Sequence, residues 1–321
     1  MTSRPLDRAF ALEAVRVTEA AAIAAAEFIG RGDEHAADHA AVESMRKTFN
    51  FLPIDGTVVI GEGERDEAPM LYIGEKVGTG GVAVDIALDP LEGTTLTAKA
   101  LPNALAVMAL AEPGTLLNAP DTYMDKVAIG GGFPEGTIDI DASPVENIRS
   151  LAKAKGVHPR EITVCILDRP RHEAHIEAVR SLGASVHLIT DGDVAGVIAT
   201  TDPATGIDIY IGRGGAPEGV LAASALRCVG GQFQARLHFR SDDEKKRAAK
   251  LGITNYDRKY TLKDLASGDV IFAATGVTNG SMLQGIHRTP EFTFTHSVMM
   301  RSSSGTVRWI KARHRRSRHE R

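Results

Sequence analysis

The region from about residue 155 to residue 229 alternates short apolar segments with amphipathic ones, and this pattern constrains the fold more than any other feature of the sequence. The expected strands lie at 162–167, 185–190 and 207–211, and the expected helices lie at 171–182, from about 194 onward and at 217–229. Strands that alternate with helices predict sheets covered by helices. We therefore assign the chain to the α/β class.

The rest of the chain adds further elements to this pattern. We expect helices at 7–29 and 38–49, and strands at 57–60, 82–89, 103–112, 270–274 and 292–300. The segment 82–89 alternates large apolar residues with alanine or aspartate as far as Pro90, so we expect its strand to end there. We predict two closely packed halves, 1–154 and 155–313, followed by a basic tail at 314–321.

The composition argues against several classes of protein. A net charge of −4 disfavours general nucleic-acid binding, which normally requires a strongly basic domain. The alanine-rich stretch 20–26 is flanked by Glu19 and Glu27, so we expect a helix of a soluble protein and no membrane span. Cys165 and Cys228 lie in apolar runs, which indicates buried thiols and not a disulfide framework or a zinc site. With no secretory leader in the sequence, we predict a cytoplasmic protein.

Acidic residues follow several of the expected strands. Ligands of open α/β sheets collect at the carboxyl ends of strands, so we expect these acids to converge. Two carboxylates roughly 4 Å apart repel by about 4 kcal/mol at an effective dielectric of about 20, unless protons or cations compensate. Oxygen ligands suit Mg²⁺ and Mn²⁺, which favours metal-dependent chemistry on a phosphate monoester. The acids are Glu62, Glu64, Asp89, Glu92, Asp191, Asp193 and Glu218.

The segment from Asp89 to Thr94, with the sequence DPLEGT, carries the strongest of these signals. Pro90 restricts the link between the two acids, and Gly93 permits a close approach of Thr94. Thr94 also suits a helix cap, and a helix start is itself a phosphate site.

The other segments each keep a structural alternative. Residues 61–64 also fit a polar turn, and residues 212–219 also fit a flexible turn between a strand and a helix. Arg169 and Arg171 suit a phosphate clamp, because arginine binds phosphate through paired N–H groups, although arginines in loops are more often solvated. Residues 191–193 also fit a turn that caps a helix.

Taken together, these segments resemble the class II, GlpX-type fructose-1,6-bisphosphatases from near the N-terminus to about residue 313. The stretch 60–78, IGEGERDEAPMLYIGEKVG, is nearly diagnostic by itself. The other matching stretches are 30–33, 37–38, VDIALDPLEGT (84–94), NAPDTYM (118–124), 170–172, DGDVA (191–195) and GGAPEGV (214–220).

The resemblance implies the fold of the lithium-sensitive phosphatase superfamily, a layered α/β/α/β/α sandwich shared with inositol monophosphatases. It also implies hydrolysis of the 1-phosphate of fructose 1,6-bisphosphate with Mn²⁺ or Mg²⁺ as cofactor. The implied metal ligands are Asp38, Glu62, Asp89, Glu92 and Glu218. The implied substrate contacts are Glu92, Gly93, Thr94, Tyr123, Arg169, Pro170, Arg171, Asp191, Gly192, Asp193 and Gly215.

The expected mechanism is direct attack of a metal-bound water on phosphorus, with no covalent intermediate. The catalytic set is Asp89, Glu92, Thr94 and Glu62, in which Thr94 orients the water or helps to deprotonate it. Arg169 and Arg171 are expected to bind the distal phosphate. Most of the expected metal ligands thus lie in the first predicted half, and most of the expected sugar and distal phosphate contacts lie in the second.

Two departures from the family and several alternatives accompany this interpretation. Arg169 stands where the family usually has lysine, and the loop 78–81 is about one residue shorter than in relatives. A dual fructose-1,6- and sedoheptulose-1,7-bisphosphatase is the nearest alternative, followed by an inositol-phosphate phosphatase and a non-catalytic sugar-phosphate sensor. We expect a homo-oligomer, a dimer or a tetramer, and no nucleic-acid partner for the basic C-terminal residues.

Overall fold

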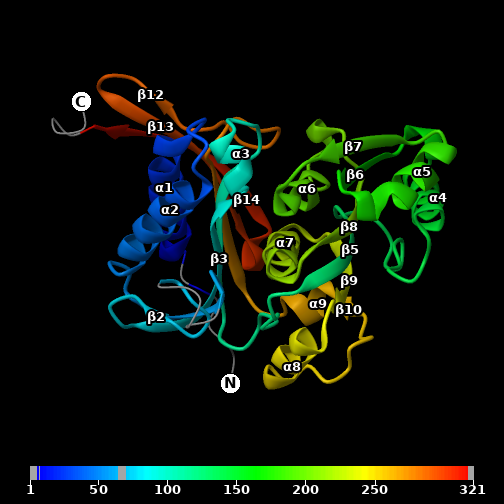
Figure 1. Ribbon diagram of the computed structural model, residues 1–321, viewed down its shortest axis with the longest axis horizontal. Helices are drawn as coiled ribbons and strands as arrows, with labels where there is room; N and C mark the ends of the chain where they lie inside the picture. The colour runs from blue at the N-terminus through cyan, green and yellow to red at the C-terminus, as the bar shows by residue number, and fades with distance from the viewer. Residues whose placement is uncertain (1–5, 7, 64–69, 317–321) are drawn as a thin grey trace. The chain divides into compact units, whose positions relative to one another are not determined.

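The computed structural model describes residues 6, 8–63 and 70–316, which form two compact units (Figure 1). The first unit combines Met1–Leu116 with Gly268–Arg321, and the second is Leu117–Ser267. These bounds differ from those of the predicted halves, 1–154 and 155–313, because the C-terminal strands return to the sheet of the first unit. Glu64 and the end of the basic tail, 317–321, lie outside the described residues.

The first unit contains an eight-stranded sheet with the order β12-β13-β11-β4-β3-β1-β2, and β14 pairs with β13. Only β1 and β3 are parallel among these pairs. The strands are β1 (Ile54–Ile60), β2 (Lys76–Val77), β3 (Val82–Glu92), β4 (Leu105–Ala111), β11 (Val270–Gly276), β12 (His287–Arg288), β13 (Phe292–Arg301) and β14 (Thr306–Arg315).

Two long helices, α1 (Ala9–Ala25) and α2 (Glu34–Phe49), pack side by side, and α1 lies against β11 and β13 (Figure 1). The alternating residues Val84, Ile86 and Leu88 of β3 belong to the core that these helices cover, as the sequence pattern predicts. Asp33 caps α2 by accepting a hydrogen bond from the Ala36 amide at 2.9 Å. Because α2 therefore begins at Glu34 and not at 38, Asp38 lies inside the helix.

The second unit contains a six-stranded sheet with the order β10-β9-β5-β8-β6-β7. The strands are β5 (Tyr123–Ile129), β6 (Thr163–Leu167), β7 (Ser185–Ile189), β8 (Ile209–Gly215), β9 (Gln232–His238) and β10 (Tyr260–Thr261). The helices are α4 (Pro144–Lys155), α5 (Glu173–Ser181), α6 (Asp193–Ala199), α7 (Ala216–Val229), α8 (Asp242–Lys250) and α9 (Leu262–Leu265), and a short 3-10 helix, η3 (Pro170–His172), precedes α5.

The sheet of the second unit carries helices on both faces. Val127 and Ile129 of β5 share a core with Ile148 of α4 and Val179 of α5. The alternate residues Met124 and Lys126 point the other way, where they approach the backbone of α7 at Gly219. Two sheets, each covered by helices, confirm the α/β class.

Several predicted boundaries need correction. β3 continues through Pro90 to Glu92, and β8 includes the glycine-rich residues that were expected to form a turn. The first two residues of the expected tail, His314 and Arg315, belong to β14. Among the described residues, no helix combines the length and the apolar character that a membrane crossing needs.

Candidate metal and phosphate site

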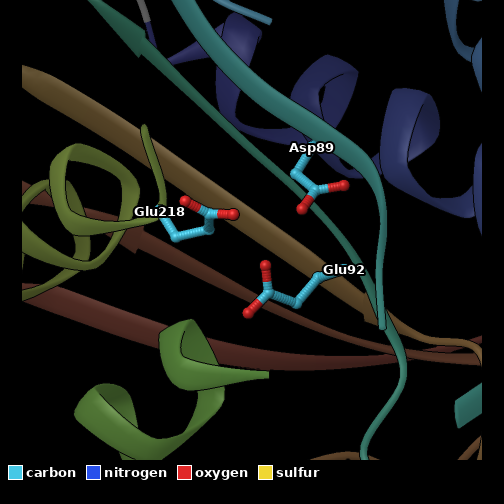
Figure 2. A group of neighbouring side chains, drawn as sticks. All are labelled: Asp89, Glu92 and Glu218. Carbon is cyan, nitrogen blue, oxygen red and sulfur yellow. The ribbon is translucent and has the colours of Figure 1, made fainter. Parts of the chain in front are cut away.

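Asp89 and Glu92 lie near the end of β3, where the pairing with β4 is irregular. Asp89 is opposite Val107 and Glu92 is opposite Leu105, so β3 accommodates one extra residue between them. Residues three apart in a regular strand point to opposite faces. The extra residue brings both carboxylates to the same side of β3 (Figure 2), where one oxygen of each lies within 4.8 Å of the other. Pro90 has no N–H for the ladder and therefore fits this irregular position.

The environment of this pair suits a divalent cation. The Glu92 side chain is only 4% exposed, and Asp89 is half-buried with its Oδ1 accepting a hydrogen bond from the Leu91 amide at 3.0 Å. Two neighbouring carboxylates that water cannot fully solvate repel each other, and a bound cation removes that repulsion. Oxygen ligands of this kind are those that Mg²⁺ and Mn²⁺ prefer.

Gly93 sets the direction of the chain immediately after the pair. Its φ of 87° and ψ of 57° are left-handed, and a Cβ there would lie 2.8 Å from Leu96 Cδ1. Gly93 is the N-cap of α3 (Thr94–Ala98), so Thr94 is the first residue of the helix. The alternative in which Thr94 caps this helix is therefore wrong.

Asp38 and Glu62, the other two expected ligands of the first unit, lie on separate elements. Asp38 is half-buried on α2, which packs against both β3 and α3. Burial raises the pKa of the Asp38 carboxyl, while the charges of His35 and His39 act in the opposite direction. Among the described residues, neither Asp38 nor Glu62 joins Asp89 and Glu92 in a group whose ligand atoms all lie within 4.8 Å of one another.

The backbone around Glu62 is fixed by contacts with the chain that returns from 70 to 75. The Glu62 amide donates to the Leu71 carbonyl at 3.1 Å, and a Cβ on Gly61 would lie 2.1 Å from that same oxygen. Glu75, only 5% exposed, accepts hydrogen bonds from the Leu71 amide and from Arg46 Nε. Arg46 lies on α2, so this carboxylate links the Glu62 loop to the helix that carries Asp38.

In the second unit, the turn from β8 into α7 carries Glu218, which is also labelled in Figure 2. A Cβ added to Gly215 would lie 1.8 Å from Glu218 Oε2, and one added to Gly214 would lie 1.8 Å from Asp193 Oδ2. These two glycines are required because acidic side chains pack directly against the backbone of the turn. Glu218 thus lies folded back over Gly215 at the first turn of α7.

Asp193 is buried at the first position of α6, and Gly192, in the left-handed region with φ 80°, is the cap. The alternative of an N-cap at Asp193 is therefore wrong. Lys126 Nζ donates to Asp193 Oδ2 at 2.6 Å, and the Tyr210 hydroxyl donates to the same oxygen at 3.3 Å. The other oxygen, Oδ1, accepts no hydrogen bond from the described part of the chain. Asp191, the first acid of this loop, is half-buried.

Tyr123, at the start of β5, lies beneath two arginine side chains. The guanidinium carbon of Arg171 is 5.0 Å from the ring centroid, and that of Arg240 is 4.6 Å from it. Arg240 pairs with Glu244, a 4% exposed carboxylate that also accepts a hydrogen bond from the Thr122 hydroxyl at 2.9 Å. Burial of Glu244 acts to raise its pKa, but these hydrogen bonds outweigh it and hold the pKa at about 2.

His172 holds the segment Arg169–His172 in position. His172 is 1% exposed; its Nδ1 lies 2.8 Å from the Leu167 carbonyl, and its Nε2 accepts a hydrogen bond from the Arg213 amide at 2.8 Å. Burial lowers the pKa of His172, which fits a neutral ring that donates through Nδ1. Arg171 in turn donates from Nε and Nη2 to the Arg213 carbonyl, and Arg169 donates to the Asp168 carbonyl.

Three basic residues of the second unit were missed by sequence reasoning. Lys126 carried no local signal, because it directly follows Asp125 in the sequence and its partner Asp193 lies 67 residues away. Arg213 and Arg240 carried none, because an arginine at the end of a strand is usually solvated. Their positions become informative only when Asp125, which pairs with Arg213, and Tyr123 are seen beside them.

Comparisons with known proteins agree with the resemblance. The family model described as bacterial fructose-1,6-bisphosphatase, glpX-encoded, matches residues 8–314. Fructose-1,6-bisphosphatase 1 class 2 of Escherichia coli strain K12 is 47% identical over 322 residues, which cover 96% of this chain and 95% of the relative. Fructose-1,6-bisphosphatase class 2 of Shigella flexneri matches with the same identity and coverage.

Among solved structures, the inositol monophosphatase from Anabaena (Nostoc) sp. PCC 7120 is similar at 16% identity and a TM-score of 0.31. The similarity covers 60% of this chain and 70% of that one.

Proposed function

Because the chain belongs to the family of bacterial, glpX-encoded fructose-1,6-bisphosphatases, we propose that it hydrolyses the 1-phosphate of fructose 1,6-bisphosphate to give fructose 6-phosphate and phosphate. The observation that carries this proposal is the pair Asp89 and Glu92, two carboxylates brought to one side of β3 beside the start of α3. Such a pair is costly without a cation and is suited to phosphate chemistry with one.

Mn²⁺ or Mg²⁺ would be held by Asp89 and Glu92, together with Asp38, Glu62 and Glu218. The chemistry of the donors supports this set, since all five are carboxylates. When bound, the ions would lower the pKa of a coordinated water and screen the charge of the phosphoryl group. Thr94, at the first position of α3, is proposed to orient the attacking water, and the backbone of Glu92, Gly93 and Thr94 to contact the phosphate.

The remaining contacts concern the sugar and the distal phosphate. We assign the distal phosphate to Arg169 and Arg171, next to Pro170, because the hydrogen bonds of both guanidinium groups go to backbone carbonyl oxygens and not to carboxylates. Tyr123, the loop Asp191, Gly192 and Asp193, and Gly215 are proposed to contact the sugar.

Further proposals concern the location of the protein, its assembly, its partners and a second substrate. A cytoplasmic location is supported by two buried cysteines, Cys165 and Cys228, that do not form a disulfide. Assembly into a dimer or tetramer and the absence of a nucleic-acid partner remain expectations from the sequence. A dual activity toward sedoheptulose 1,7-bisphosphate is the nearest alternative function, and it shares the site described here.

Removal of one carboxylate tests the proposed site. In Asp89→Asn, phosphate release from fructose 1,6-bisphosphate should fall by at least about a thousandfold with saturating Mn²⁺ or Mg²⁺, because the variant loses an anionic ligand. The rise in melting temperature that Mn²⁺ gives the parent should also shrink, since only the folded state binds the ion. Release of phosphate and thermal unfolding are the two measurements.

Asp85→Asn is the matched control, because Asp85 lies on β3 four residues before Asp89 and accepts a hydrogen bond from the Gly114 amide at 2.6 Å. It should keep most of the activity. Folded Asp89→Asn protein with near-parental turnover would refute the assignment. Parallel assays with sedoheptulose 1,7-bisphosphate and inositol phosphate separate the alternative enzymes, and binding without hydrolysis by the parent would identify a sensor.

A further inference from the structure

Arg240 is the residue of the second unit whose position the proposed function leaves unexplained. It follows β9 by two residues, and its side chain is 53% exposed. An arginine with this exposure is usually mobile in water. Here its guanidinium carbon is held 4.6 Å from the centre of the Tyr123 ring.

The buried carboxylate of Glu244 holds Arg240 in place. Glu244 accepts hydrogen bonds from Arg240 Nε at 2.8 Å, from Arg240 Nη2 at 2.5 Å and from the Arg240 amide at 2.6 Å. Glu244 is itself held by the Thr122 hydroxyl. The guanidinium is thus oriented by an acid on one edge, while its Nη1 donates to no acceptor within the described residues.

A second guanidinium lies over the same ring. Arg171 Cζ is 5.0 Å from the Tyr123 centroid, and Arg240 Cζ is 4.6 Å from it. The two guanidinium carbons therefore lie near each other, at most the sum of these two distances apart. Arg171 donates to a neutral carbonyl, that of Arg213, and keeps its full charge. Two guanidinium groups held on one half-buried aromatic ring present N–H donors that an anion lying between them can share.

The chemistry of such an anion is constrained by the groups around it. Arginine presents planar pairs of N–H donors that match the oxygens of a phosphate monoester, and Tyr123 adds a hydroxyl beside them. Resting on the proposed function, we propose that Arg240 is a second distal phosphate residue, which acts with Arg171 across Tyr123 and selects bisphosphate over monophosphate substrates.

The test uses the full-length protein and three sugar phosphates. For Arg240→Ala, the KM for fructose 1,6-bisphosphate should rise between about tenfold and a hundredfold, the range expected for a lost hydrogen bond to a charged group, with kcat within about threefold of the parent. The inhibition constant of fructose 6-phosphate, which carries only the distal phosphate, should rise in parallel. That of fructose 1-phosphate, which lacks this phosphate, should stay within about twofold.

Arg258→Ala is the matched control. Arg258 lies 4.9 Å from the centre of the Tyr260 ring and pairs with Asp264 at 2.6 Å, so it makes the same two kinds of contact at another place in the second unit. It should change none of the three constants. Because removal of Arg240 leaves the Glu244 carboxylate buried without its partner, Arg240→Gln combined with Glu244→Gln provides a second variant in which no charge is left unpaired.

The outcomes separate this inference from the proposed function. Parent protein that fails to hydrolyse fructose 1,6-bisphosphate would refute the proposed function. The role of Arg240 would be refuted if the parent protein is active and the folded Arg240 variants keep the parental KM. It would also be refuted if these variants lose affinity for fructose 6-phosphate and fructose 1-phosphate equally.

Discussion

Lys126 and Asp193 form an ion pair inside the second unit, where their side chains are 0% and 5% exposed. The lysine also approaches Gly219 at the first turns of α7, and the carboxylate fills the space beside Gly214. One buried pair therefore supports both the loop before α6 and the turn that carries Glu218. Charges of this kind are tolerated in an apolar interior only because each has a partner within hydrogen-bonding distance.

Removal of Lys126 should show how much the ion pair contributes to the stability of the folded protein. Lys126→Met is expected to lower the free energy of unfolding by about 3–5 kcal/mol, because it leaves the Asp193 carboxylate buried without its cation. Urea unfolding followed by circular dichroism measures this loss. Lys126→Met combined with Asp193→Asn should recover most of the stability, since neither buried charge remains.

Lys155→Met is the control, because Lys155 also pairs with an aspartate, Asp208, but at a site where its side chain is 31% exposed. A pair that water reaches contributes less than a fully buried one, so this variant should lower the stability by much less than Lys126→Met does. A Lys126→Met protein as stable as the parent would show that the pair does not support the interior.

Individual residues differed in how far the sequence could predict them. That Asp89 and Glu92 lie close together could be predicted because they are only three residues apart in the sequence, next to Pro90 and Gly93. Lys126 was missed because its partner lies 67 residues away in the sequence, and no local pattern encodes that contact. The same reason applies to Arg240, whose aromatic partner Tyr123 lies on β5, more than 100 residues earlier in the sequence.

At the scale of elements, the decisive feature of the first unit is the irregular pairing of β3 with β4. The sequence predicted a strand that ends before Pro90, since proline interrupts a ladder. The strand continues because the extra residue falls at the proline, and Glu92 resumes pairing opposite Leu105. A simple alternation cannot reveal such an irregularity, because register depends on the partner strand.

In the second unit, His172 connects two elements, the short helix η3 and the strand β8. It is buried with both ring nitrogens engaged, and burial lowers its pKa below the ordinary value of 6.5. The folded state therefore binds this proton less readily than the unfolded state. The stabilisation is complete above about pH 6.5 and is lost as the pH falls through the lowered pKa.

The free energy of unfolding of the parent protein should consequently decline as the pH falls below about 6.5. In His172→Gln it should be lower at pH 7.5, since one bridge is lost, but its decline with acid should be smaller. Urea unfolding at several pH values provides the measurement, and His187→Gln, on the exposed surface of β7, is the control. An equally steep decline in His172→Gln would assign the acid sensitivity to other groups.

At the scale of the whole molecule, the chain enters the first unit, builds the second unit as one continuous insertion and returns to complete the first. Residues 117–267 lie between the two parts of the first unit. The sequence predicted a division near residue 154 because the strand and helix rhythm begins there. It gave no sign that β11 would pair with β4, more than 150 residues earlier, because strand pairing is non-local.

This arrangement predicts different behaviour for two truncated proteins. The core of the second unit is formed by residues between Val127 and Ile211, all inside 117–267, so this segment expressed alone should fold and unfold cooperatively on heating. A chain that stops at 267 lacks β11, which pairs with β4 along seven successive residues, and should lose the first sheet and aggregate. Circular dichroism and size-exclusion chromatography measure both outcomes. Gradual, non-cooperative melting of 117–267 would show that the second unit depends on the first for its stability.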